Sequence, residues 1–189
     1  MENEIIEANA ERRRLPAWVI VFSFALLIVF LGLIAWGLRR AMSGPISVGD
    51  KVPDITMLGF DGQTYRTADM GGKVIVLNFW ASWCKPCEQE AAELEEAYQY
   101  FKDSDEVVFM GLAWTDTEPN SLEYLRKFGI TYANGPDLRT TVSQMFRIRG
   151  VPETYVIDGE GKVLYRLAGP VTSMSLEGGL REAIEAARE

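Results

Sequence analysis

Hydrophobic positions follow two different patterns along this chain. Residues 15–38 read LPAWVIVFSFALLIVFLGLIAWGL, a stretch of 24 residues without a charged side chain. A helix of that length, rising about 1.5 Å per residue, is long enough to cross a hydrocarbon core of about 30 Å. We therefore predict one membrane-spanning helix over residues 15–38. Trp18 and Trp36 lie near its two ends, where indole rings prefer the membrane interface.

The charges that flank this helix predict its orientation. Three arginines, Arg12 to Arg14, precede it, and Arg39 and Arg40 follow it. Because basic residues favour the cytoplasmic side, we expect residues 1–14 to form a short cytoplasmic segment and the rest of the chain to be exported. A cleaved signal peptide is the alternative. Its apolar core would be only about 7–15 residues long, which argues for a retained anchor.

Beyond the anchor the hydrophobic runs are short and separated by polar segments. Residues 39–47 are predicted to be a linker, and residues 48–189 are long enough for one packed domain. The patterns predict these elements in chain order: a hairpin over 55–65, a strand at 73–80, a helix at 88–101, a strand at 107–113, helices at 121–128 and 140–146, strands at 154–157 and 163–167, and a helix at 176–188. This order predicts an α/β sandwich with a mixed central sheet.

Composition narrows the chemistry that the domain can perform. The 189 residues include no histidine and only two cysteines, and acidic residues outnumber basic ones by 27 to 19. The absence of histidine excludes Ser-His-Asp and Cys-His catalysis, and the acidic balance argues against a nucleic-acid partner. We expect no metal, because the chain has neither histidine nor a third cysteine as ligand, and no cofactor, because it has no phosphate-binding glycine motif or dinucleotide fingerprint. Electrons must therefore come from another dithiol.

The two cysteines form the motif Cys84-Lys85-Pro86-Cys87, directly after the predicted strand at 73–80. A helix follows, so Cys84 is expected at or just before a helix N-terminus and Cys87 in its first turn. Such a position stabilises a thiolate, and the spacing lets the pair alternate between dithiol and disulfide. Half of a zinc site is the alternative, but the chain offers neither further cysteine nor histidine as ligands.

Three segments carry a resemblance to a known group of proteins. Residues 78–87, NFWASWCKPC, resemble the thioredoxin superfamily, most of all the membrane-anchored TlpA/ResA/CcmG reductases. Residues 48–54, VGDKVPD, resemble the N-terminal extension of that group, and residues 150–158, GVPETYVID, resemble its loop with a cis-proline. The resemblance covers nearly all of residues 48–189. It implies a thioredoxin-like sandwich with an N-terminal β-hairpin extension, preceded by one transmembrane helix.

The resemblance also assigns roles to residues of this chain. It implies that Cys84 is the exposed nucleophile and Cys87 the resolving thiol, joined in a redox disulfide. Pro152 would be the cis-proline that faces them. Trp83 and Val151 are expected to contact the substrate, an extended peptide that pairs with the backbone of the cis-proline loop.

Two acids and one amide stand close to these positions in the sequence. Glu90, three residues after Cys87, falls on the same helical face. It either raises the cysteine pKa values and passes protons, or is an exposed acid of the first turn. Glu153 either meets the substrate or is solvated. Asn78 stands where cytosolic thioredoxins carry a buried acid, which predicts a site without that proton acceptor.

The resemblance implies a membrane-tethered, extracytoplasmic thiol-disulfide oxidoreductase. The expected partners are a membrane-embedded dithiol as electron donor and a disulfide-bearing protein of cytochrome c or copper-site assembly as substrate. The same chemistry can run as an oxidase, because its direction depends on the reduction potential. A peroxiredoxin-type peroxidase is a further alternative, although the chain lacks the Thr-x-x-Cys context. A copper chaperone of this fold would need a histidine.

Overall fold

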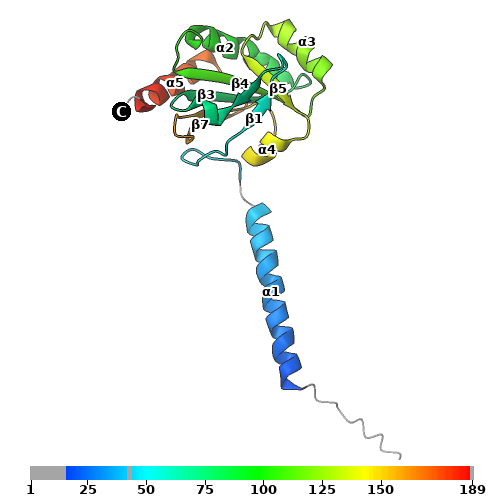
Figure 1. Ribbon diagram of the computed structural model, residues 1–189. Helices are drawn as coiled ribbons and strands as arrows, with labels where there is room; N and C mark the ends of the chain where they lie inside the picture. The colour runs from blue at the N-terminus through cyan, green and yellow to red at the C-terminus, as the bar shows by residue number, and fades with distance from the viewer. Residues whose placement is uncertain (1–15, 42–43, 188–189) are drawn as a thin grey trace, which may run out of the picture. The chain divides into compact units, whose positions relative to one another are not determined.

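The computed structural model describes residues 16–41 and 44–187 (Figure 1). The chain divides into two compact units, Met1–Ser43 and Gly44–Glu189, and each is described by itself. The predicted cytoplasmic segment, residues 1–14, lies outside the described residues.

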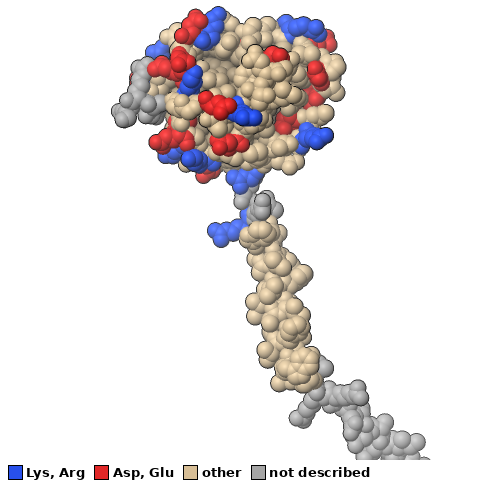
Figure 2. Space-filling model, in the orientation of Figure 1, with Lys and Arg blue, Asp and Glu red and all other residues tan. Residues whose placement is uncertain are grey.

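The first unit contains helix α1 (Ala17–Ala41). By length and composition its residues Ala17–Arg39 are able to cross a membrane, in agreement with the span expected at 15–38. Figure 2 shows neither acidic nor basic side chains along this helix before its C-terminal end. The apolar side chains of this helix are exposed within its own unit, and such a surface needs a nonpolar environment.

The second unit is built on a five-stranded sheet in the order β5-β4-β3-β6-β7. The strands are β3 (Val74–Trp80), β4 (Val107–Trp114), β5 (Ala133–Asp137), β6 (Glu153–Ile157) and β7 (Val163–Ala168). Strand β3 pairs parallel with β4, β4 parallel with β5, and β6 antiparallel with both β3 and β7. The mixed central sheet is therefore confirmed. A separate hairpin of β1 (Thr56–Leu58) and β2 (Thr64–Arg66) confirms the predicted N-terminal extension.

Helices cover both faces of this sheet (Figure 1). They are α2 (Lys85–Phe101), α3 (Glu118–Phe128), α4 (Thr141–Phe146) and α5 (Ser173–Ala187), with a short 3-10 helix η1 (Thr67–Met70) after the hairpin. Apolar side chains of α2 and α5 form one core cluster with one face of the sheet. Helix α4 and the N-terminal extension form a second cluster with the other face.

Strand β3 supplies both clusters, because all seven of its side chains are buried. Side chains along a strand alternate between the two faces. Val74 and Val76 therefore pack in the cluster of α2 and α5, whereas Ile75, Leu77 and Phe79 pack in the cluster of α4. A continuous hydrophobic run is the expected sequence of a strand that is buried on both faces.

The segment before the hairpin closes part of the outer edge of β7. The amide of Gly49 donates to the carbonyl of Val163 at 2.8 Å, and the amide of Val163 donates to the carbonyl of Asp50 at 2.9 Å. Ile46 is buried in the α4 cluster. Residues 44–47, which the sequence predicted as linker, are thus part of the folded unit.

Strand β5 was missed by the sequence patterns, because Ala-Asn-Gly-Pro-Asp is a composition typical of loops. It is an edge strand, where a proline is tolerated. Gly135 lies so close to the β1 strand that an added Cβ atom would be 2.5 Å from the carbonyl oxygen of Leu58 and 2.6 Å from Met57. Helices α2 and α5 each begin three residues earlier than predicted.

Candidate active site

The two cysteines lie at the connection between the central strand β3 and helix α2. Strand β3 ends at Trp80, and Cys84 is the N-cap of α2. The amide of Cys87, in the first turn, donates to Sγ of Cys84 at 3.1 Å. Pro86 occupies the second helical position, where its missing N–H leaves no hydrogen bond unmade. This confirms the predicted placement of both sulfurs at a helix N-terminus.

Cys84 and Cys87 are joined by a disulfide, with their Cα atoms 5.3 Å apart. Cys84 is 4% exposed and Cys87 is completely buried. The order of accessibility agrees with Cys84 as the attacking residue. The expectation that Cys84 is exposed is wrong for this oxidised form, because the residue is packed in a cluster of buried side chains.

The cis-proline loop faces the disulfide, as the sequence predicted. The peptide bond between Val151 and Pro152 is cis, and the carbonyl oxygen of Val151 lies 3.5 Å from Sγ of Cys84. Val151 is half-buried and Pro152 is buried. The main chain of the loop is therefore within contact distance of the Cys84 sulfur, the atom expected to react with a substrate.

Aromatic rings form the exposed rim of the site. Trp83 is 58% exposed, and its ring centroid lies 6.0 Å from that of Trp114 at the end of β4. Buried Asp116 joins the two loops, since it accepts hydrogen bonds from the amide and the hydroxyl of Ser82 at 2.6 and 3.0 Å. Trp83 is thus held at the surface, next to Cys84.

Glu90 lies in the interior of the domain rather than on the surface of the helix. It is 1% exposed. Its carboxylate accepts hydrogen bonds from Nδ2 of Asn78 at 2.9 Å and from the amide of Val171 at 3.0 Å. Burial raises the pKa of Glu90 to about 7, against the lowering effect of these two donors.

Two sequence-based interpretations are corrected by this arrangement. Glu90 is not an exposed first-turn acid, because it is buried among α2, β3 and the segment before α5. Nor does Asn78 leave the site without a buried acid. Its amide holds the carboxylate of Glu90 in the interior, so the acid comes from the helix instead of from the strand.

Three further contacts at the site had no clear signal in the sequence. Asn78 also donates to Oγ1 of Thr154, two residues after the cis-proline, at 3.0 Å. The hydroxyl of Tyr124 on α3 donates to the carbonyl of Cys87 at 2.7 Å, and its ring stacks on Trp80 at a centroid distance of 4.5 Å. These contacts join residues far apart in the chain, which spacing alone does not reveal.

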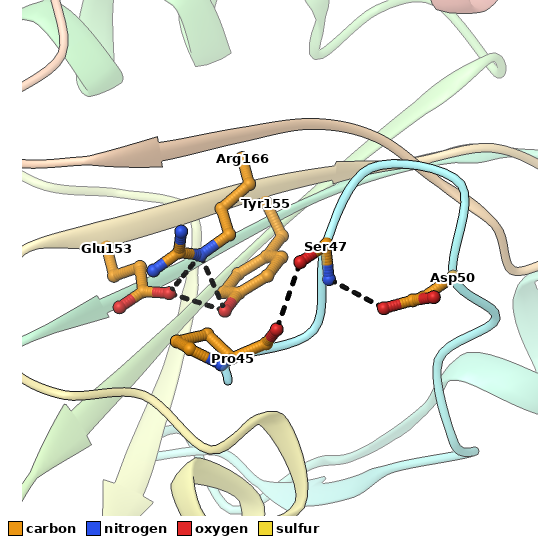
Figure 3. A network of polar contacts seen from close by, with 6 residues as sticks. All are labelled: Pro45, Ser47, Asp50, Glu153, Tyr155 and Arg166. Atoms are coloured by element: carbon orange, nitrogen blue, oxygen red, sulfur yellow. Dashed lines mark hydrogen bonds and ion pairs between the residues drawn. The ribbon is translucent and has the colours of Figure 1, made fainter. Parts of the chain in front are cut away.

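Glu153, predicted either to meet the substrate or to be solvated, is not solvated. It is buried and forms an ion pair with Arg166 of β7, with Nε and Oε1 2.6 Å apart (Figure 3). The carboxylate is already paired inside the protein, so it is not available as a surface contact in this form.

The geometry suits thiol-disulfide exchange. An attacking thiolate needs a helix N-terminus or another source of positive potential, which α2 provides at Cys84. A second thiol within bonding distance can displace a bound partner. A buried carboxyl group with a pKa near 7 can take up or release a proton at neutral pH.

Comparison with known proteins supports this chemistry. The model of a family described as AhpC/TSA matches residues 48–166. The thiol-disulfide oxidoreductase ResA of Bacillus cereus is 26% identical over 166 residues, which cover 86% of this chain and 95% of that protein. ResA of Geobacillus kaustophilus is 30% identical over 163 residues, covering 84% of this chain and 92% of that protein.

A further relative is the thiol:disulfide interchange protein HelX of Rhodobacter capsulatus, 39% identical over 110 residues, which cover 57% of this chain and 60% of HelX. Among solved structures, a DsbF homologue from Corynebacterium diphtheriae has a TM-score of 0.63 and 26% identity, covering 71% of this chain and 87% of that one. A thioredoxin family protein from Chlorobium tepidum, 24% identical with a TM-score of 0.63 over 73% of this chain and 98% of its own, has the same fold.

The burial of Glu90 predicts a pH dependence of stability. Its pKa is about 7 in the folded protein, against an ordinary value of 4.5. Between these values the folded state binds one more proton than the unfolded chain, so the free energy of unfolding falls as the pH rises. Glu90→Gln should remove this fall, which is on the order of 3 kcal/mol. Urea unfolding at a series of pH values measures it.

Glu96→Gln is the matched control, because Glu96 is an exposed acid on the same helix. It should keep the pH dependence of the unmodified protein. Parallel curves for the Glu90→Gln variant and the unmodified protein across this window would contradict the assignment.

Proposed function

Since the chain belongs to the AhpC/TSA family and is a ResA-like thiol-disulfide oxidoreductase, we propose that it reduces disulfides of other proteins while α1 tethers it to a membrane. The observation that carries this proposal is the Cys84–Cys87 disulfide at the N-terminus of α2, facing cis-Pro152. A tether raises the effective concentration of the site near a membrane-bound partner.

The proposed reaction starts from the dithiol. The Cys84 thiolate attacks one sulfur of the substrate disulfide, forms a mixed disulfide and releases the other substrate sulfur as a thiolate. Cys87 then loses its proton and attacks Sγ of Cys84, which releases the second substrate thiolate and forms the Cys84–Cys87 disulfide. Two electrons pass to the substrate. A second dithiol protein restores the pair by the reverse exchange.

Glu90 is the proton acceptor in this proposal. It lies one helical turn beyond Cys87, is buried and has a pKa of about 7. A carboxylate near the two sulfurs also disfavours a free thiolate, so it holds the cysteine pKa values above those of strong oxidants. Both effects favour a reductant.

The proposed substrate and donor classes are supported by the resemblance to the TlpA/ResA/CcmG reductases and by the apolar helix α1. We place the domain outside the cytoplasm, with residues 1–14 inside. The proposed substrate is a disulfide in the haem-binding motif of an apocytochrome c or in a copper-site assembly protein. The proposed donor is a membrane-embedded dithiol protein, because a tethered domain meets membrane partners most often.

The reduction potential separates a reductase from an oxidase that uses the same residues. We expect a value near or below about −270 mV for the Cys84–Cys87 pair, the scale of thioredoxin. Equilibration with a glutathione or dithiothreitol redox buffer measures it. A value near about −120 mV would point to an oxidase. A peroxidase is disfavoured because Ala81 stands where peroxiredoxins carry the threonine of Thr-x-x-Cys.

The order of attack predicts which variant traps a substrate. In Cys87→Ser, the mixed disulfide at Cys84 has no resolving thiol, so it should accumulate. In Cys84→Ser no mixed disulfide should form, because Cys87 is completely buried. Non-reducing electrophoresis of acid-quenched cells detects the adducts. Trapping by Cys84→Ser alone would reverse the two roles.

The orientation of the anchor is tested with a membrane-impermeant thiol reagent. In the Cys87→Ser variant Cys84 is the sole cysteine, since the chain has only two. After reduction it should react in intact bacterial cells. The matched control carries Ala8→Cys in a chain with both native cysteines replaced by serine, and it should react only after lysis. Labelling of Cys84 only after lysis would place the domain in the cytoplasm.

A further inference from the structure

A partly buried polar network begins at Glu153, the residue after the cis-proline, and takes no part in the electron transfer itself. Oε1 of Glu153 lies 2.6 Å from Nε of Arg166 and accepts a hydrogen bond from the hydroxyl of Tyr155 at 2.5 Å. Nε of Arg166 also lies 3.4 Å from that hydroxyl. Figure 3 shows the three side chains converging on one point.

The sheet register brings these side chains together. Tyr155 of β6 is directly opposite Arg166 of the antiparallel strand β7, so their side chains share one face of the sheet. Glu153 lies two residues before Tyr155 and therefore points to the same face. Phe79 and Phe146 pack edge-on against the Tyr155 ring at centroid distances of 6.0 and 4.9 Å, which aims its hydroxyl at Glu153.

The network is separate from the buried acid of the redox pair. Thr154, the residue between Glu153 and Tyr155, points to the opposite face and contacts Asn78. Glu90 lies on that opposite face as well. Glu153 and Glu90 therefore lie on opposite faces of the sheet. The hydrogen bond to Glu153 raises the pKa of Arg166, which keeps the guanidinium charged.

Strand β7 holds the loop at a second point. The amide of Gly169, just after β7, donates to the carbonyl of Pro152 at 2.9 Å. Pro152 is thus held through its carbonyl, and the next residue, Glu153, is held through its side chain. Both contacts lie within two residues of Val151, whose carbonyl is 3.5 Å from Sγ of Cys84.

We propose that Arg166 is a positioning residue that acts through Glu153 and Tyr155 to hold the cis-proline loop in the shape that an extended protein substrate requires. This inference rests on the proposed reduction of protein disulfides. A buried carboxylate without its partner would shift to find other donors or a proton. The first residues to move would be Glu153 and, through the chain, Pro152 and Val151.

The proposal separates substrates by size. A peptide disulfide has to align its backbone with the loop, whereas a small aromatic disulfide needs only access to the attacking sulfur. Loss of the network should therefore weaken binding of the peptide, because a misplaced loop cannot pair with its backbone. It should leave the reaction with the small disulfide unchanged.

Arg166→Gln in the full chain, kept in detergent micelles, tests this. The reduced protein is mixed with excess disulfide, and its oxidation is followed by tryptophan fluorescence. One substrate is a synthetic peptide closed by a Cys-x-x-Cys disulfide, and the other is 5,5′-dithiobis(2-nitrobenzoic acid). For the peptide we expect the half-saturating concentration to rise about tenfold with little change in the limiting rate. For the small disulfide we expect no change.

Three variants serve as controls. Arg181→Gln makes the same charge change at an exposed residue of α5 and should behave as the unmodified protein. Tyr155→Phe keeps the packed ring but removes the hydroxyl, so it should give a smaller rise for the peptide. Glu153→Gln combined with Arg166→Gln should add little to Arg166→Gln alone, because residues that act through one contact are not additive.

Two results would overturn the proposal. Unchanged half-saturation for the peptide in Arg166→Gln would show that the network does not position the loop. An equal loss of rate with both disulfides would show general damage to the site. If the unmodified protein reduces neither disulfide, the proposed function itself fails, which this design distinguishes from a failure of Arg166.

Discussion

The side chains of the central strand β3 have to pack in the cores on both faces of the sheet, and the site depends on that constraint. Its side chains Val74 and Val76 pack on the face covered by α2 and α5, and on that face Asn78 reaches Glu90 of α2. Its odd-numbered side chains lie on the other face, where Phe79 packs against Tyr155. The strand then ends at Trp80, and the chain turns into the helix whose first residues carry the sulfurs. Position and polarity of the site thus come from one run of seven buried residues.

Two consecutive residues after the cis-proline connect these two faces. Thr154 joins the Asn78–Glu90 side of the sheet, and Glu153 joins the Arg166–Tyr155 side. The loop is therefore held by contacts on both faces of the sheet. Val151, the residue before the cis-proline, lies beside the disulfide. A rigid loop of this kind can present its backbone to a substrate at little entropic cost, because it is already in the required shape.

Much of this architecture could be predicted from the sequence, and the exceptions have physical causes. Strand β3, the redox motif and the cis bond before Pro152 have strong local patterns or a specific resemblance. Strand β5 has neither, because an edge strand beside a close backbone contact favours Gly and Pro. The burial and the partners of the two acids, Glu90 and Glu153, were harder to predict. Spacing put Glu90 on the face of Cys87, but its burial depends on Val171, 81 residues away. The partner of Glu153 likewise lies on another strand.

The short segment that follows the anchor affects the packing and the aggregation of the domain when it is produced without the anchor. Residues 49–52 form hydrogen bonds with Val163 of the edge strand β7 and with Gly161 in the turn before it, and Ile46 fills part of the core. An uncovered edge strand offers unpaired amides and carbonyls to a second chain, which invites edge-to-edge aggregation. A soluble version trimmed at residue 53 would expose this edge and leave a cavity where Ile46 was. A version that starts at Gly44 keeps the hydrogen bonds to the edge strand and the buried Ile46 side chain. The first residues after the anchor therefore cover both the edge of the sheet and part of the core.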